Sequence, residues 1–217
     1  MIIFDCDGVL VDREIIPNAI DAELMTSAGW PITAEDLIRD HIGQPKAAIW
    51  EQVARRRGAP WPEGLLERAD VLLLDRIETD LRPVQGITDA LRGLPGKKAV
   101  ASSSALPKLR RSLERCGLLD FFEPRIFSAS QVARGKPAPD VFLFAAERSG
   151  ERPADCIVVE DSVAGVTAAR AAGMRVVGFT AGRHSYPGHA EKLLEAGAAA
   201  VFDRSDRLTC AALGSNM

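Results

Sequence analysis

Polar side chains that could do chemistry follow short apolar segments of this chain. They are four carboxylates, one hydroxyl and one ammonium group: Asp5, Asp7, Ser102, Lys136, Glu160 and Asp161. If they share one crevice, two carboxylates about 4 Å apart repel each other by roughly 4 kcal/mol at an effective dielectric constant near 20. A site with four acids therefore needs a compensating cation, and ligands that are all oxygen atoms point to Mg²⁺.

A phosphate group is the expected ligand at such a site, because its oxygens can bridge a metal ion and the ammonium group of Lys136. Asp5 and Asp7 are two residues apart and precede Gly8, which favours a turn that brings the second carboxylate over the first. One carboxylate can attack phosphorus while the other handles the proton. We therefore predict that Asp5 is the nucleophile and that Asp7 is the general acid and base.

The segments that must position these residues alternate between short apolar runs and stretches long enough for a helix. The expected strands are residues 1–4, 98–101, 125–127, 156–159, 175–179 and 199–202. The expected helices between them are residues 86–92, 106–116, 140–148, 163–172 and 188–196. Apolar runs of this length suit strands buried on both faces, and their alternation with helices predicts an α/β fold with a doubly wound parallel sheet. Loops at the carboxyl ends of its strands converge on one crevice.

Residues 14–80 differ from the rest of the chain, because they contain amphipathic stretches and no strand-like run. Prolines such as Pro31 and Pro45 interrupt these stretches. We predict a helical insertion at 14–80 within a core formed by residues 1–13 and 81–217. Two linkers would join the insertion to the core, so it could open and close.

Composition excludes several classes of protein. A net charge of -3 and a pI near 5.7 argue against a nucleic-acid binder. The four cysteines lack zinc-site spacing, and no signal peptide or membrane span is indicated. We expect a cytoplasmic protein without a membrane partner, either a monomer or a small homo-oligomer. His41, His184 and His189 are interpreted as incidental to the chemistry.

Four ordered segments resemble the motifs of the haloacid dehalogenase superfamily. They are Asp5-Cys6-Asp7-Gly8-Val9, Ser102 after an apolar strand, the run from Gly135-Lys136-Pro137 to Asp140, and Val158-Val159-Glu160-Asp161-Ser162. The resemblance spans nearly the whole chain and implies a Rossmann-like core, a helical cap inserted after the first strand and a bound Mg²⁺. It also implies that Asp5 becomes phosphorylated and that Ser102 and Lys136 hold the phosphoryl oxygens. The implied metal ligands are Asp5, the Asp7 backbone carbonyl, Glu160 and Asp161.

Within the superfamily, the first and last motifs resemble a branch that contains β-phosphoglucomutase and sugar-phosphate phosphatases such as 6-phosphogluconate phosphatase. A histidine in the cap hinge of the mutase helps to withhold the general acid from water, and Pro17 occupies the matching position here. This departure favours a phosphatase acting on a small phosphorylated metabolite, a sugar or sugar-acid phosphate, with the mutase as the alternative. In the segment 42–46, Lys46 is the cap residue expected to grip the distal group of the substrate. Ser103, beside Ser102, is a further candidate substrate contact.

Structural roles compete with several of these functional ones. Ser102 or Ser104 could cap the following helix, and Lys46 could be a solvated surface lysine. A non-catalytic binding module with this fold is a further alternative. It would be expected to have lost at least one residue of the set Asp5, Asp7, Lys136 and Asp161.

Overall fold

The computed structural model describes residues 1–41 and 46–214, and the chain divides into two compact units. The first unit comprises Met1–Asp12 and Arg82–Met217, and the second comprises Arg13–Leu81. Boundaries at 13/14 and 80/81 were expected from the sequence, and each observed boundary lies within one residue of them.

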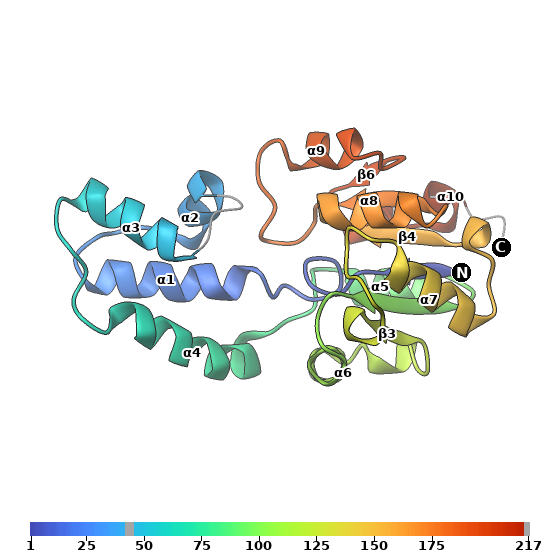
Figure 1. Ribbon diagram of the computed structural model, residues 1–217, viewed down its shortest axis with the longest axis horizontal. Coiled ribbons are helices and arrows are strands. Elements are labelled where there is room, and N and C mark those ends of the chain that lie inside the picture. The colour runs from blue at the N-terminus through green and yellow to red at the C-terminus, as the bar shows by residue number, and fades with distance from the viewer. Residues whose placement is uncertain (42–45, 215–217) are drawn as a thin grey trace. The chain divides into compact units, whose positions relative to one another are not determined.

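The first unit is built on a six-stranded sheet in which every adjacent pair of strands is parallel. The strand order is β3-β2-β1-β4-β5-β6, and Figure 1 shows the sheet together with its helices. The strands are β1 (Ile2–Phe4), β2 (Lys98–Ser102), β3 (Ile126–Ser128), β4 (Ile157–Glu160), β5 (Arg175–Phe179) and β6 (Val201–Phe202). The predicted α/β class with a doubly wound sheet is confirmed.

Helices lie between successive strands of this sheet, and one more follows the last strand. They are α5 (Ile87–Gly93), α6 (Leu106–Arg115), α7 (Asp140–Ser149), α8 (Val163–Ala171), α9 (His189–Glu195) and the C-terminal α10 (Cys210–Leu213). Short 3-10 turns lie at Leu119–Phe121, Ala129–Gln131, Pro153–Asp155 and Ser205–Arg207. Each crossover returns the chain to the same end of the sheet, so the loops that follow the strands share one edge.

Apolar side chains cover both faces of the sheet, because neighbouring residues of a strand point to opposite sides. Ile3 belongs to a buried cluster with Phe142 of α7 and Val166 of α8. The next residue, Phe4, is also fully buried, and its ring packs edge-to-face on Phe122 with centroids 5.9 Å apart. This burial on both faces explains why the central strands are continuous apolar runs.

The second unit is helical in its described residues. It contains α1 (Ile15–Ser27), α2 (Ala34–His41), α3 (Lys46–Arg57) and α4 (Leu65–Asp80). Helix α1 packs against α2 and α4. In α3 the buried Trp50 packs edge-to-face on Trp61 at 5.5 Å, and Trp61 Nε1 donates a hydrogen bond to the Trp50 carbonyl. The unit therefore has a small core of its own.

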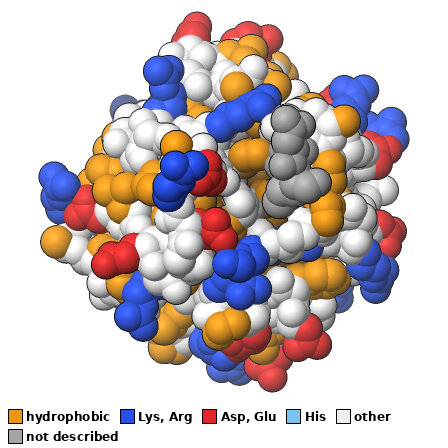
Figure 2. Space-filling view, turned by 90° about the vertical axis from the view of Figure 1, so that its right-hand side faces the viewer, with side chains coloured by type: hydrophobic (Ala, Val, Ile, Leu, Met, Phe, Trp, Pro, Cys, Tyr) orange, Lys and Arg blue, Asp and Glu red, His pale blue; other side chains and the backbone are white. Residues whose placement is uncertain are grey.

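Charged side chains of both signs lie on the surface. On the face shown in Figure 2, Lys and Arg side chains are interspersed with Asp and Glu. Many of these charges form local ion pairs, such as Lys97 with Glu151 at 2.8 Å and Arg152 with Asp155 at 2.6 Å. Among the described helices, none combines the length and hydrophobicity required to cross a bilayer.

Candidate active site

The register of the central strands positions Asp5. Phe4 of β1 lies level with Val100 of β2 and Val159 of β4. The Asp5 backbone N–H continues this ladder and donates to the Val159 carbonyl at 2.9 Å. Asp5 and Glu160 consequently leave adjacent strands at the same level, where their side chains can meet.

Lys136 lies between these two carboxylates. Its Nζ is 2.5 Å from Asp5 Oδ1 and 2.6 Å from Glu160 Oε1, and its side chain is only 4% exposed. Burial acts to lower the pKa of Lys136, but the charges of Asp5 and Glu160 outweigh burial and raise it. The lysine is therefore a permanent cation in the site at neutral pH.

One lysine does not balance the acids around it. Asp5, Glu160 and Asp161 are all buried, and each offers a carboxylate oxygen within 4.8 Å of the others. Burial raises the pKa of Asp5 well above its ordinary range despite the opposing effect of Lys136, and burial raises the pKa of Asp161 to about 6. A cluster of hard oxygen donors with excess negative charge fits a divalent cation such as Mg²⁺.

Local hydrogen bonds orient Glu160. Its Oε2 accepts from the Ser162 backbone N–H at 2.8 Å and from the Ser162 hydroxyl at 3.0 Å. The Ser162 Oγ in turn accepts from the Gly165 N–H and so caps helix α8. A Cβ atom at Gly165 would lie 1.8 Å from Glu160 Oε1, so the glycine leaves room for this carboxylate. Ser162 thus caps the N-terminus of α8 and also fixes the position of the Glu160 carboxylate.

The Asp7 side chain is held by Ser104, which is itself held by Ser128 at the end of β3. The Ser104 hydroxyl donates to Asp7 Oδ2 at 2.7 Å, and the buried Ser128 hydroxyl donates to the Ser104 carbonyl at 2.7 Å. Helix α6 has Ala105 at its N-cap without a side-chain cap bond, so neither Ser102 nor Ser104 caps it. Ser102 Oγ instead accepts from the Ser104 N–H at 3.1 Å. Sequence reasoning had missed the contact between Ser104 and Asp7.

Gly8 allows the turn that follows Asp7. Its φ of 89° lies in the left-handed region, which glycine adopts without steric cost. A Cβ atom there would lie 2.0 Å from Asp161 Oδ2. The glycine is therefore required both by the backbone conformation and by the close approach of the Asp161 carboxylate.

Two predicted substrate contacts lie outside the acid cluster. Ser103 is exposed in the loop after β2. Lys46 is the first residue of α3 in the helical unit, where its Nζ lies 2.7 Å from Asp70 and 3.4 Å from the buried Asp21. Residues 42–45 of the predicted cap segment lie outside the described residues.

Two histidines that were interpreted as incidental to the chemistry contact Asp161. His184 Nε2 lies 2.8 Å from Asp161 Oδ2, and His189 Nε2 lies 2.7 Å from the Asp161 carbonyl oxygen. His184 lies in the segment that joins β5 to α9, and His189 is the first residue of α9 (Figure 1). Two histidines shortly after the predicted strand 175–179 were the available signal in the sequence.

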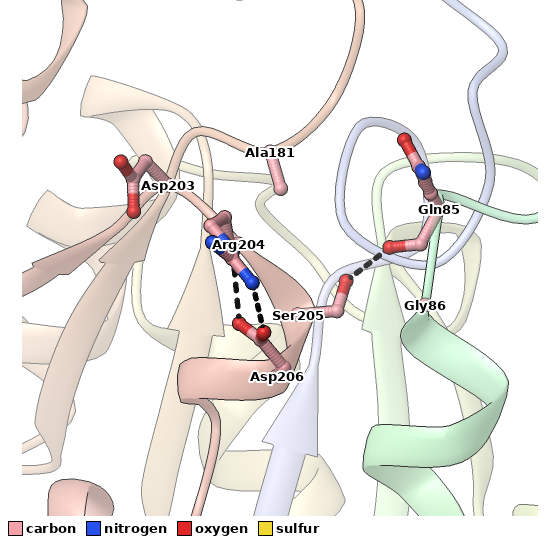
Figure 3. A pocket seen from close by; sticks show the side chains of 7 residues that line it. All are labelled: Gln85, Gly86, Ala181, Asp203, Arg204, Ser205 and Asp206. Atoms are coloured by element: carbon pink, nitrogen blue, oxygen red, sulfur yellow. Dashed lines mark hydrogen bonds and ion pairs between the residues drawn. The ribbon is translucent and has the colours of Figure 1, made fainter.

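A pocket of about 390 Å³ also opens on the sheet unit (Figure 3). The residues that line it are Gln85, Gly86, Ala181, Asp203, Arg204, Ser205 and Asp206. Arg204 forms an ion pair with Asp206, and the Ser205 hydroxyl donates to the Gln85 carbonyl at 2.7 Å. None of the lining residues belongs to the acid cluster.

Comparisons with known proteins identify the family of this chain. Residues 1–173 match the haloacid dehalogenase-like hydrolase family. The chain is 33% identical over 214 residues to a phosphorylated carbohydrates phosphatase of Thermotoga maritima, with 92% of each chain covered. It is 29% identical over 189 residues to 6-phosphogluconate phosphatase of Escherichia coli, with coverage of 86% and 85%.

A solved structure agrees with both comparisons. A HAD family hydrolase from Deinococcus radiodurans, crystallised with bound phosphate and sodium, has a TM-score of 0.85 and 29% identity. The alignment covers 97% of this chain and 93% of that one. Sequence and fold lead to the same conclusion: the chain belongs to the haloacid dehalogenase-like hydrolases.

Proposed function

We propose that this protein is a Mg²⁺-dependent phosphatase that hydrolyses a small phosphomonoester, a sugar or sugar-acid phosphate, through an aspartyl-phosphate on Asp5. The observation that carries the proposal is the buried carboxylate of Asp5, which contacts Lys136 and lies within 4.8 Å of carboxylate oxygens of Glu160 and Asp161. Asp5, Glu160 and Asp161 are the side chains proposed to hold the ion, together with the Asp7 backbone carbonyl. Bound there, Mg²⁺ would neutralise charge on the phosphoryl oxygens.

In the first half of the reaction, a carboxylate oxygen of Asp5 bonds to phosphorus as the bond from phosphorus to the ester oxygen breaks. Asp7 gives its proton to the leaving alkoxide, which departs as an alcohol. Lys136 and Ser102 are proposed to hold phosphoryl oxygens, and Lys136 offsets their charge. The products of this half are the free alcohol and phosphorylated Asp5.

In the second half, water attacks the phosphorus of the aspartyl-phosphate. Asp7, now a carboxylate, takes the proton from that water, and the bond between phosphorus and the Asp5 oxygen breaks. Inorganic phosphate leaves, and both aspartates return to their starting states. The hydrogen bond from Ser104 to Asp7 keeps this side chain near the position that both proton transfers require.

The named relatives support the substrate class, because their names describe phosphatases of 6-phosphogluconate and of phosphorylated carbohydrates. The helical unit Arg13–Leu81 is proposed to act as the cap, with Lys46 and Ser103 as candidate substrate contacts. The pairing of Lys46 with Asp21 and Asp70 supports the structural role for this lysine at least as well as the substrate-binding one. A cytoplasmic location is proposed on the basis of the sequence.

Phosphate release from a panel of sugar and sugar-acid phosphates tests the proposal. Turnover should require Mg²⁺, disappear with EDTA and return when Mg²⁺ is added back. Asp5→Asn should reduce turnover to background, whereas Asp89→Asn, at a side chain that is 84% exposed, should not change it. Turnover by Asp5→Asn would refute the covalent mechanism. Binding of phosphorylated sugars by the unmodified protein without phosphate release would identify a non-catalytic module.

The mutase alternative is tested with β-glucose 1-phosphate. A phosphatase releases inorganic phosphate and glucose, whereas a mutase returns glucose 6-phosphate with little free phosphate. Pro17, where the mutase has a hinge histidine, favours the first result. Isomerisation without phosphate release would replace the proposed function by the mutase.

A further inference from the structure

His184 and His189 contact one residue through two different groups. The Nε2 atom of His184 is 2.8 Å from a carboxylate oxygen of Asp161, and the Nε2 atom of His189 is 2.7 Å from the backbone carbonyl oxygen of the same residue. The first contact restrains the side chain and the second restrains the backbone that carries it. Together they limit both the position and the rotation of the Asp161 carboxylate.

The His189 ring is itself fixed by its surroundings. It is 6% exposed, and it stacks on Tyr186 with ring centroids 4.6 Å apart and planes 9° apart. Because a carbonyl oxygen only accepts, Nε2 must carry the proton, and Nδ1 is then an acceptor that faces the Ser185 hydroxyl at 3.3 Å. The His184 ring packs edge-on against His189 at 5.8 Å.

The loop that carries His184 also packs closely against the segment that contains Gly8 and Asp12. A Cβ atom at Gly182 would lie 2.6 Å from the Gly8 carbonyl oxygen and 2.7 Å from His184 Nδ1. The Arg183 backbone N–H donates to the buried Asp12 carboxylate at 2.9 Å. The position of His184 is therefore determined by packing and by a backbone hydrogen bond, not only by its contact with Asp161.

Such restraint matters for a carboxylate that must serve a small ion. Mg²⁺ requires near-octahedral geometry, so a carboxylate ligand that can rotate loses affinity. The Asp161 carboxylate also lies within 4.8 Å of the buried carboxylates of Asp5 and Glu160, which repel it. A donor on one Asp161 oxygen opposes rotation away from them and leaves the other oxygen for the ion.

We propose that His184 and His189 are positioning residues that hold Asp161 in place for the divalent cation. The inference rests on the proposed function, because it requires a cation at this cluster. Neither imidazole is assigned to the reacting atoms. Their effect should therefore appear in metal affinity, while turnover at saturating metal is largely kept.

Calorimetric titration of the metal-free protein with Mg²⁺, without substrate, measures the relevant quantity. His184→Ala should weaken Mg²⁺ binding by roughly 10- to 100-fold, the usual effect of removing a partner of a metal ligand. His184→Gln can present an amide N–H near the position of Nε2 and should recover most of the affinity, whereas the shorter His184→Asn should not. Arg183→Ala keeps the backbone hydrogen bond to Asp12 and should bind Mg²⁺ like the unmodified protein.

His189→Phe tests the second contact, because phenylalanine can still stack on Tyr186 but cannot donate to the Asp161 carbonyl. It should also weaken Mg²⁺ binding. Activity measured against Mg²⁺ concentration should show a higher half-saturating concentration for each weakened variant, with kcat recovered at saturation. A thermal melt in EDTA reports whether each variant is folded. If the His184→Ala variant does not fold, the comparison of His184→Gln with His184→Asn still tests the role of His184.

The outcomes separate this inference from the proposed function. If His184→Ala and His184→Asn bind Mg²⁺ as tightly as the unmodified protein, which binds the ion and releases phosphate, only the positioning role is refuted. A loss of kcat at saturating metal with unchanged Mg²⁺ affinity also refutes it. If the unmodified protein binds no Mg²⁺, both this inference and the proposed function are refuted.

Discussion

The lysine at the centre of the acid cluster offers a direct test of the electrostatic argument. Replacement of Lys136 by methionine keeps most of the side-chain volume and removes the charge. In the unmodified protein, Lys136 Nζ lies 2.5 Å from Asp5 and 2.6 Å from Glu160. The replacement leaves these two buried carboxylates without a compensating charge. Removal of one partner from a buried ion pair costs about 3–5 kcal/mol, because the other charge remains buried.

In a domain of this size, 1 kcal/mol shifts Tm by about 2–4 °C. Lys136→Met should therefore lower the Tm of the metal-free protein by roughly 6–20 °C. Mg²⁺ should restore part of this loss, because the ion becomes the compensating charge and binding to the folded state alone stabilises it. The matched control is Lys108→Met, at an exposed position of α6, which should leave Tm nearly unchanged.

Differential scanning calorimetry in EDTA, repeated with Mg²⁺, measures both effects. Lys136→Arg keeps the charge but not the shape, so it separates the loss of charge from the loss of fit. If Lys136→Met melts within about 2 °C of the unmodified protein in EDTA, the three acids do not depend on this lysine for compensation. The electrostatic account of the site would then be refuted.

Three further predictions concern the same loops. The pKa of Asp161 is raised to about 6 from 3.8 in the unfolded chain, so this residue should contribute about 3 kcal/mol to a loss of stability of the metal-free protein as pH rises from about 4 to about 6. Asp161→Asn should remove that contribution in urea titrations with EDTA, whereas the contribution of Asp5, whose pKa is also raised, should remain. Gly8→Ala should fail to bind Mg²⁺ in calorimetry, because the new methyl group would meet Asp161 Oδ2 at 2.0 Å and φ is 89°. Ser104→Ala removes the hydroxyl that binds Asp7 and should lower kcat/KM roughly 10- to 100-fold, as expected for a hydrogen bond to a charged group; an unchanged kcat/KM would remove Ser104 from the mechanism.

The outline of the fold follows from patterns that are local in the sequence. Buried parallel strands need apolar residues on both faces, so runs such as residues 98–101 and 175–179 were recognisable without tertiary information. The carboxyl ends of parallel strands share one edge, which is why Asp5 and Glu160 could be expected to meet. The helical character of Arg13–Leu81 was visible for the same reason, because it contains amphipathic periods and no strand-like run.

Contacts between loops could not be obtained in this way. Ser104 looked like a helix cap because it precedes α6, yet its hydroxyl donates to Asp7, which is 97 residues away in sequence. The partner of Lys46 was equally hidden, since Asp70 belongs to another helix of the same unit. A side chain with several possible acceptors is assigned by packing, and packing is not a local property of the sequence.

The sequence by itself determined the α/β class, the order of the motifs and the chemical types that meet at the edge of the sheet. Only the tertiary structure decided which atoms are paired: Lys136 with two acids, Ser104 with Asp7, and His184 and His189 with Asp161. The physical reason is the separation along the sequence over which each feature is determined. Strand and helix patterns depend on neighbours a few residues apart, whereas a buried hydrogen bond depends on where several distant loops place their atoms to within a few tenths of an ångström.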